Sequence, residues 1–274
     1  MLRLRIKILV CSLLLPLFVP LAAKAQPVLA DRGGIRSDDI VISIIIDDLG
    51  NQMAAGRRAL KLPGAVTYAF LPHLASSPRL AELAYRQHKE VMLHLPMEAD
   101  KGEALGPGGL TRAMNEQQLK DQMRRDINAV PHVRGFNNHM GSLLTKNVKR
   151  MTWVMQMAMF RDDLYFVDSR TTRDTVALKE AEKHGIRGAK RDVFLDYEKD
   201  NEAIVRQQLK VLIAQARKKG TALAIGHPYR DTMKVLETWL PTLAKQGIKL
   251  VPVSELISIR KARRNQRWQL SSSR

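Results

Sequence analysis

The stretch Val41-Ile42-Ser43-Ile44-Ile45-Ile46-Asp47-Asp48 decides how the rest of this sequence is interpreted. It is a short, nearly continuous apolar run that ends in two carboxylates. Strands that are buried on both faces of a parallel sheet have this pattern. In α/β proteins, functional side chains gather just past the carboxyl ends of such strands. The stretch therefore predicts a buried parallel strand with a functional site at its end.

Four further apolar runs also end in side chains that can ligate a metal or transfer a proton. They are Val91–Leu93 before His94, Val133–Phe136 before Asn137-Asn138-His139, Leu164–Val167 before Asp168, and Leu223–Gly226 before His227. The carboxyl ends of parallel strands meet at one edge of a sheet, so the five runs could converge there. Their recurrence predicts a metal-dependent active site.

From residue 38 onward, apolar runs alternate with segments that have helical ends. Ser77 followed by Pro78 predicts an N-cap with proline at the first helical position, and Asn115 precedes a helical segment at 116–130. Three predicted helices stop at Gly185, Gly220 and Gly247, where glycine accepts the left-handed conformation. Seven or eight β-α repeats predict a closed or nearly closed parallel barrel with helices outside. An open doubly wound sheet is the alternative, because strand order cannot be read from one sequence.

The N-terminus has the order of a secretory signal peptide. A basic start, residues 1–7, precedes the apolar stretch 8–22, and Ala23-Lys24-Ala25 is a small-x-small cleavage site. An uncleaved membrane anchor is the alternative, although the apolar stretch is shorter than the roughly 20 residues of a transmembrane helix. We expect cleavage near Ala25 and export to the periplasm or the extracellular space. The predicted organisation is a signal peptide at 1–25, a linker at 26–37, a barrel domain at 38–256 and a basic C-terminal tail at 257–274.

Cysteine use and charge restrict the chemistry further. The single cysteine, Cys11, lies in the predicted signal peptide, so the mature chain would have no disulfide and no thiolate ligand, which leaves His, Asp and Glu for a metal.

The formal net charge is +18, and six basic residues lie in the segment from Arg260 to Arg274. The tail could make weak contact with an anionic surface or could be solvated. No base-reading motif appears, which excludes nucleic acid as a partner.

The Asp47-Asp48 pair is the sharpest local signal. Neighbouring side chains on a strand point in different directions, so one carboxylate could bind a metal while the other takes a proton. Asp48 could instead cap a following helix. The sequence has no G-x-x-x-x-G-K-[ST] loop, which excludes a Walker B site, and no G-x-S-x-G elbow, which argues against a serine nucleophile.

The two histidine-bearing strands supply the other candidate ligands. His94 and His139 are predicted to bind the metal, because His and carboxylate ligands around an open position are what catalytic zinc requires. Glu98, four residues after His94, could reach the same ion or orient one of its ligands. Asn137 and Asn138 could donate hydrogen bonds to a substrate carbonyl or an oxyanion, or could simply form a turn.

The last two strand ends are candidates for proton transfer. His227 is a candidate general acid, because an imidazole with a pKa near ~6.5 can protonate a leaving group around neutrality. Asp168 is predicted to hold a histidine in position, with helix capping as the alternative. Tyr229, close after His227, is included with Glu98, Asn137 and Asn138 among the candidate substrate contacts.

Taken in order, these motifs resemble those of the divergent polysaccharide deacetylase family, an offshoot of the polysaccharide deacetylase (carbohydrate esterase) superfamily. The resemblance covers residues 39–256. It rests on Ile-Ile-Asp47-Asp48-x-Gly50, His94-Leu-Pro-Met-Glu98, Asn137-Asn138-His139-Met-Gly-Ser142, Asp168-Ser169 and Gly226-His227-Pro228. It implies a distorted (β/α) barrel of seven to eight mostly parallel strands with outer helices. It also implies one divalent metal, usually zinc, and hydrolysis of N- or O-acetyl groups on cell-surface glycans.

The resemblance also implies individual roles. The first aspartate of the superfamily's pair is the catalytic base and the second is a metal ligand, and these match Asp47 and Asp48. His94 matches the first histidine of a His-x-x-x-His motif whose second position is Glu98 here. An arginine–proline motif is replaced by residues 137–139, so His139 would supply the missing imidazole. His227 matches the proton donor and Asp168 its supporting aspartate.

The resulting hypothesis is a metal-dependent hydrolase that removes acetyl groups from a cell-envelope polysaccharide by attack of a metal-bound water. A zinc ion would be held by Asp48, His94 and His139, with Asp47 as base and His227 as acid. An inactive glycan- or wall-binding protein that keeps the same fold is the main alternative. A metal phosphodiesterase is a third.

Overall fold

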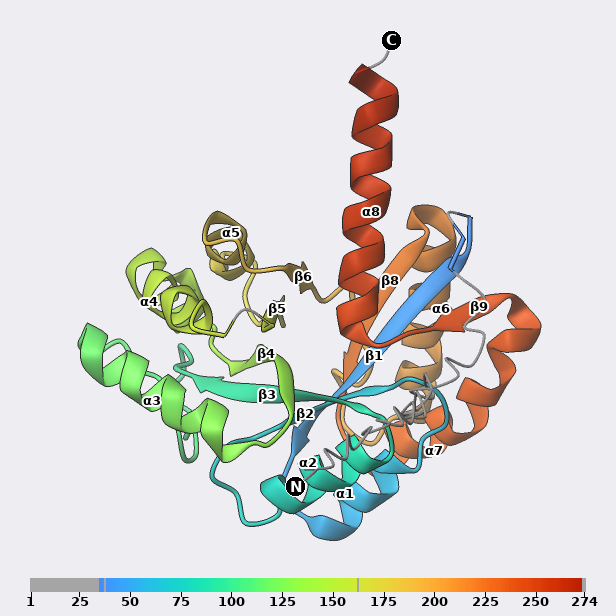
Figure 1. Ribbon diagram of the computed structural model, residues 1–274. Coiled ribbons are helices and arrows are strands. Elements are labelled where there is room, and N and C mark those ends of the chain that lie inside the picture. Colours follow the sequence, from blue (N-terminus) through green and yellow to red (C-terminus); the bar gives the residue numbers. More distant parts are fainter. Residues whose placement is uncertain (1–34, 37, 162, 273–274) are drawn as a thin grey trace, which may run out of the picture. The chain divides into compact units, whose positions relative to one another are not determined.

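The apolar runs of the sequence are parallel strands of one sheet in the computed structural model, which describes residues 35–36, 38–161 and 163–272 (Figure 1). The predicted signal peptide, its cleavage site and nearly all of the predicted linker lie outside the described residues. The strands are β1 (Ile40–Leu49), β2 (Thr67–Phe70), β3 (Glu90–Met97), β4 (Val133–Met140), β5 (Tyr165–Asp168), β6 (Gly188–Lys190), β7 (Val193–Phe194), β8 (Thr221–Gly226) and β9 (Ile248–Leu250).

The strand order is β6-β5-β4-β3-β2-β1-β8-β7, and β9 pairs with the first part of β1. The two end strands belong to one continuous segment, residues 188–194. The first part of this segment pairs with β5 and the second part with β8. Between them, the backbone N–H of Arg191 donates to Asp168 and that of Asp192 to Leu223. The sheet therefore curls into the predicted distorted barrel, with one segment spanning its two edges.

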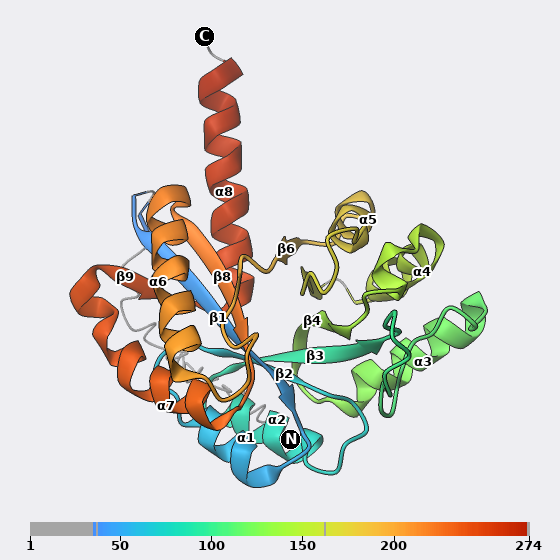
Figure 2. The ribbon, with the colours of Figure 1, turned by 180° about the vertical axis from the view of Figure 1, so that it is seen from behind.

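Helices surround the curled sheet (Figures 1 and 2). Viewed from behind in Figure 2, α6 lies beside β8 with α7 below it, and α3 and α4 lie on the opposite side, near the end of β3. The helices are α1 (Met53–Leu60), α2 (Ser77–Arg86), α3 (Glu116–Ala129), α4 (Val148–Ala158), α5 (Ala177–Lys183), α6 (Glu202–Lys219), α7 (Arg230–Trp239) and α8 (Val253–Ser272), with short 3₁₀ turns η1 (Leu144–Lys146), η2 (Leu240–Thr242) and η3 (Ala244–Gln246).

The isoleucines of β1 show how the sequence separates the two faces of the sheet. Ile42, Ile44 and Ile46 pack into the cluster that joins the sheet to the helices, whereas Ile45 is equally buried but lies outside that cluster. Side chains alternate along a strand, so Ile45 and then Asp47 face the interior of the barrel. Strand parity thus directs Asp47 inward at the carboxyl end of β1.

The structure confirms the predicted fold class and adds two features. The short strand β6 was not predicted, because its three residues, Gly188-Ala189-Lys190, have no apolar pattern. Residues 257–272, predicted as a basic tail, continue helix α8. Among the described residues, no helix is both long enough and apolar enough to cross a membrane.

Candidate metal centre

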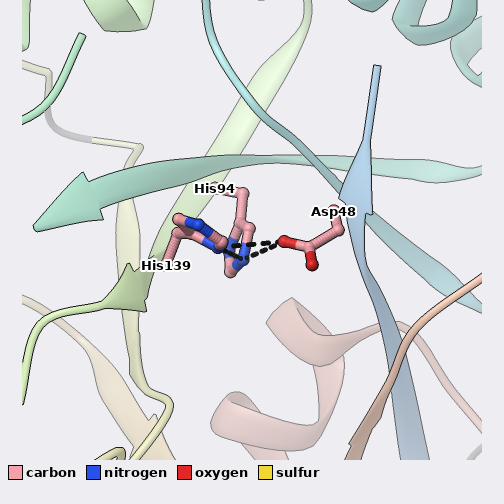
Figure 3. Close-up of side chains that lie close together, drawn as sticks. All are labelled: Asp48, His94 and His139. Carbon is pink, nitrogen blue, oxygen red and sulfur yellow. Dashed lines mark hydrogen bonds and ion pairs between the residues drawn. The ribbon is translucent and has the colours of Figure 1, made fainter. Parts of the chain in front are cut away.

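Three predicted ligands from three strands meet at the carboxyl end of the sheet. Asp48 Oδ1 lies 3.1 Å from His94 Nε2 and 2.9 Å from His139 Nδ1. The two imidazole nitrogens are 3.1 Å apart. Figure 3 shows the carboxylate and both rings pointing toward one another from β1, β3 and β4. The three donor atoms form a nearly equilateral triangle.

This triangle has the dimensions of one face of a metal coordination shell. Zinc bonds of about 2.0–2.1 Å in a tetrahedral site place neighbouring ligand atoms about 3.3 Å apart. Asp48 Oδ1 is buried and has no well-aligned hydrogen-bond donor among the described residues, despite the two close nitrogens. A cation between the three atoms would satisfy this oxygen and both nitrogen lone pairs. The residues present therefore fit a divalent metal with nitrogen and oxygen ligands.

The backbone of β1 explains how two consecutive carboxylates can serve one site. Alternation alone would turn Asp48 away from Asp47, toward the helices. Instead Asp48 has a φ of 57°, and the pairing of β1 with β2 shifts register between Ile46 and Leu49. Aspartate tolerates this left-handed conformation better than most residues. The irregularity returns the Asp48 carboxylate to the barrel mouth, and the expectation that the two side chains diverge is corrected.

A buried chain of polar contacts holds His94 at Nδ1, the ring nitrogen that does not belong to the triangle. Asn137 Oδ1 lies 2.8 Å from His94 Nδ1, and Asn137 Nδ2 donates to both oxygens of Asp47, at 2.9 and 3.0 Å. Since Nδ1 must donate to the amide oxygen, Nε2 is left facing the triangle. Such partners fix the orientation of a metal-bound imidazole. Asn137, predicted as a substrate contact, is fully buried in this supporting role.

The charges of the cluster favour a cation at its centre. Burial raises the pKa of Asp48, but the imidazoles of His139 and His94 outweigh burial and hold the pKa of this carboxyl well below its usual range. Burial would lower the pKa of His94, yet Asp47 and Asp48 raise it to about 9. The metal-free protein therefore stabilises a proton where a metal ion would supply the positive charge.

His227 faces the cluster from β8, and Asp196 holds it in place. His227 Nδ1 is 2.9 Å from Asp196 Oδ1, while Nε2 lies 3.7 Å from Asp48 Oδ2. Asp196 Oδ2 also accepts from the backbone N–H of His227 and from the hydroxyl of Thr232. Burial lowers the pKa of His227, but the hydrogen bond and charge of Asp196, together with the charges of Asp48 and Asp47, raise it overall.

The supporting aspartate for His227 is therefore Asp196 and not Asp168, which corrects the prediction. Asp168 is the last residue of β5, and its side chain bonds to residues of the loop that follows. Its Oδ1 accepts from the backbone N–H of Arg170 and its Oδ2 from the hydroxyl of Thr175. These contacts form a local turn that orders the loop after β5. They do not cap a helix, because the next helix, α5, begins at Ala177 and its N-cap is Val176.

Two further candidate contacts are used elsewhere. Glu98 accepts from the backbone N–H of Arg112 at 2.6 Å and so fastens the long loop after β3 instead of reaching the metal cluster. Asn138 has the opposite strand parity to Asn137 and His139. Its amide bonds to Met140 O and to the backbone N–H of Ser169. Asn138 is buried, and Glu98 is engaged with Arg112, so contact of either side chain with a substrate stays a prediction.

Tyr229 does lie at the rim of the site. Its ring stacks on His227 with centroids 5.1 Å apart. Together with Asp48 and the first residues of α1 and α7, it lines a groove of about 430 Å³. Burial raises the pKa of Tyr229, so its hydroxyl is a neutral donor around neutrality. An aromatic face beside the candidate acid is suited to contact with a ring-shaped substrate.

Sequence reasoning missed Asp196, and also Arg191, which lies between β6 and β7. The signal for Asp196 was present, because it follows Val193-Phe194-Leu195, another apolar run that ends in a carboxylate. The run was predicted as a strand, but the carboxylate at its end was not singled out. Arg191 is half-buried and close enough to Asp47 for that carboxylate to act on its pKa, which burial lowers overall.

The comparisons with known proteins agree with this architecture. Residues 44–257 match the family described as divergent polysaccharide deacetylase. The chain is 36% identical over 241 residues to the uncharacterized protein YibQ of Escherichia coli strain K12, covering 88% of this chain and 72% of that protein.

Solved structures share the fold. The uncharacterized protein ATU2773 of Agrobacterium tumefaciens C58 superposes with a TM-score of 0.76 at 24% identity, covering 80% of this chain and 89% of that chain. A protein of Bacillus anthracis described as a CE4 family pseudoenzyme, BA3943, superposes with a TM-score of 0.50 at 17% identity, covering 81% and 66%.

Proposed function

This chain belongs to the divergent polysaccharide deacetylase family, and from that premise we propose that it removes N- or O-linked acetyl groups from a cell-envelope polysaccharide with the help of one zinc ion. The observation that carries the proposal is the triangle of Asp48 Oδ1, His94 Nε2 and His139 Nδ1, each pair 2.9–3.1 Å apart. A carboxylate and two imidazoles with an open side are the ligand set of catalytic zinc.

Asp48, His94 and His139 would hold the ion. When bound there, zinc would lower the pKa of a water molecule and polarise the acetyl carbonyl. Asn137 keeps the Nε2 of His94 directed at the triangle by binding its Nδ1. The burial of His94 keeps bulk water away from this ligand, which strengthens electrostatic interactions in the site.

Asp47 would serve as the general base. It is the carboxylate that remains once Asp48 is assigned to the metal, and burial raises its pKa above the usual value, which makes it a stronger base. Asn137 orients both of its oxygens. His227 would donate a proton to the leaving nitrogen or oxygen, because Asp196 keeps its Nε2 pointed at the cluster and favours the protonated imidazole.

The test is acetate release from an acetylated envelope polysaccharide by the purified chain. We expect release that stops after removal of metal with a chelator and returns when zinc is added. Elemental analysis should give about one metal ion per chain. A chain that carries one metal ion and releases no acetate from N- or O-acetylated glycans would refute the hydrolase.

The second candidate function is a glycan-binding protein that keeps the fold and has lost hydrolysis. Glu98 occupies the place of the superfamily's second metal-binding histidine but is bound to Arg112, so the ligand set is rearranged relative to that pattern. One protein of similar fold is described as a pseudoenzyme. Retention on wall material without acetate release would support this alternative.

Export of the chain is part of the proposal. The site would meet envelope glycans after cleavage near Ala25, and N-terminal sequencing of the protein recovered from cells would test this. An intact N-terminus on protein recovered from the cytoplasm would contradict it.

A further inference from the structure

A second concave surface lies beside β6, away from the three metal-binding atoms. Two grooves, each of about 560 Å³, adjoin there and share Lys190 in their linings. Figure 1 shows β6 running between α5 and α8, which contribute walls to one of the grooves. The other is lined by the loop after β5, by residues 190–192 and by the end of α6. We call the two together the basic groove.

The basic groove carries an excess of cations that nearby acids do not balance. Glu182 and Asp192 are the carboxylates in its lining. Asp192 is already paired with Arg260, at 2.6 Å, and lies 3.9 Å from Lys219. Seven other basic residues of the lining form no ion pair with any described residue: Arg170, Arg173, Arg187, Lys190, Arg191, Lys261 and Arg264.

Unbalanced charge in a concave surface indicates a ligand. Like charges at close range repel and lower the stability of the fold, and walls of low dielectric strengthen their combined field. Some basic residues of this chain are neutralised by an acid, as Arg58 is by Glu237. Other exposed cations, such as Arg57 and Lys61, also form no ion pair with a described residue, but those of the basic groove are gathered in one concave surface. The basic groove keeps seven cations without such partners, so an anion that binds there would remove a repulsion as well as gain an attraction.

Arg191 connects the basic groove to the metal centre. Its guanidinium is fixed by hydrogen bonds to the carbonyl oxygens of Ser169, at 2.6 Å, and Arg170, at 3.1 Å. It also lies 4.7 Å from the ring centroid of Phe194, which is itself 5.6 Å from the ring of His227. A ligand held in the basic groove is therefore two side chains away from the candidate acid.

We propose that the basic groove binds a polysaccharide chain that bears carboxylate or phosphate groups and delivers it to the metal centre. Two adjoining grooves that share a wall residue can accommodate a polymer chain, whereas a flat bilayer would touch only their rims. The choice of a polysaccharide among polyanions rests on the proposed function, while the requirement for negative charge rests on the groove alone. The partner is thus an acidic glycan and not a neutral one.

The experiment compares affinities of the full chain, measured without turnover, for a uronate-rich polysaccharide and a neutral polysaccharide of similar length. The groove variant is Arg187→Gln/Lys190→Gln/Arg264→Gln. A matched control removes three exposed cations that also form no ion pair with a described residue, on and near α1 and α2: Arg57→Gln/Lys61→Gln/Arg79→Gln. Each basic side chain near an anionic surface contributes several-fold, so we expect about a hundredfold loss for the groove variant. The control should stay within about twofold of the wild type.

Salt and competitor polymers complete the test. Affinity for the acidic polysaccharide should fall steeply as ionic strength rises. Equal binding of the neutral polysaccharide, or equal losses in the two triple variants, would overturn the proposal. Stronger binding to duplex DNA or to anionic phospholipid vesicles than to the acidic polysaccharide would also overturn it, because the ligand of the groove would then be that partner and not a glycan. Because the measurement needs no acetate release, a failure of the hydrolase proposal would leave the binding result intact.

Discussion

At residue 48 the chain adopts a conformation that few side chains tolerate, and the whole site depends on it. With a φ of 57°, Asp48 leaves the regular strand path and joins Asp47 at the barrel mouth. A left-handed residue costs about 1 kcal/mol or more, which the contacts of the surrounding strands must offset. The two carboxylates thereby occupy different environments, Asp47 buried and bound to Asn137, Asp48 beside two imidazoles.

The two residues proposed for proton transfer can be separated from those proposed for the metal. Asp47→Asn and His227→Ala should each retain bound metal, because neither residue contributes an atom to the triangle of proposed ligands. Acetate release should fall by about 10²–10⁴-fold in each, the usual contribution of a general acid or base. Metal content by elemental analysis and turnover by acetate release are the paired measurements. Unchanged turnover in both variants would show that other groups move the protons.

Asp196 should affect catalysis through its contact with His227. Asp168, which does not contact His227, should have no such effect. Asp196→Asn removes the charge that raises the pKa of His227, so NMR titration should show that pKa falling. Turnover at neutral pH should fall about ten- to hundredfold, because a positioning partner is lost. The matched variant Asp168→Asn should leave the His227 titration unchanged. If the two variants shift the titration equally, the contact between Asp196 and His227 has no special role.

Metal affinity should depend on pH through His94. In the metal-free protein its pKa is raised to about 9, so below that pH a metal ion must displace a proton from it. Apparent zinc affinity should therefore rise by up to about tenfold per pH unit between pH 6.5 and 9 and then level off. The same raised pKa stabilises the metal-free fold below about pH 6.5, and this contribution is lost as pH rises through 9. Competition with a chromophoric chelator measures the affinity, and a flat profile over this range would contradict the assignment.

At the scale of elements, strand β4 delivers two site residues and depends on a glycine to do so. A Cβ atom at Gly135 would lie 2.5 Å from ring atoms of Tyr165 on the neighbouring strand β5. Because Tyr165 is almost fully buried, its ring has little room to move. The close approach of these strands sets the position of Asn137 and His139, two and four residues further along β4.

Gly135→Ala should therefore destabilise the fold by about 1–3 kcal/mol, the usual cost of overpacking a core, and should lower metal occupancy with it. Denaturant unfolding gives the free energy. Gly102→Ala is the control, because a Cβ there meets nothing within 4 Å and only its left-handed backbone opposes the change. A loss at Gly135 no larger than at Gly102 would mean that the contact with Tyr165 relaxes freely.

How well the sequence predicted the structure differs from one strand to another. Short, mostly apolar runs located β1, β3, β4, β5 and β8, and their ends supplied the three proposed ligands, because apolar continuity reports burial directly. Asn138 was misplaced although strand parity, counted from His139, excluded it. Asp196 and Asp168 were exchanged because no pattern in the sequence shows which strand lies beside β8. That information belongs to sheet order, which depends on contacts distant in sequence.

At the scale of the whole molecule, the proposed metal would join strands that are far apart in the sequence. Asp48, His94 and His139 belong to β1, β3 and β4, so an ion bound only by the folded state stabilises that state. At zinc concentrations about 100-fold above the dissociation constant the gain is about 2.7 kcal/mol. For a domain of this size we expect a melting temperature about 5–10 °C higher with zinc than with chelator.

Thermal unfolding of the wild type and of His94→Ala, each with zinc and with chelator, makes this test. The difference between the two conditions should vanish in the variant. His88→Ala is a suitable control, because His88 is exposed and lies before the amino end of β3, whereas the triangle lies at the carboxyl end of the sheet. A zinc-dependent shift that persists in His94→Ala would place the ion elsewhere.

Residues 188–194 pair with β5 at one end and with β8 at the other. Because both pairings must be kept, few changes in the length of this segment can be tolerated. An inserted or deleted residue there would move one partner out of register with the other. Exchange of exposed side chains, by contrast, would leave both pairings intact. Descendants of this chain can therefore be expected to vary at this joint in polarity while keeping its length fixed, so that new substrate preferences would arise there through altered charge.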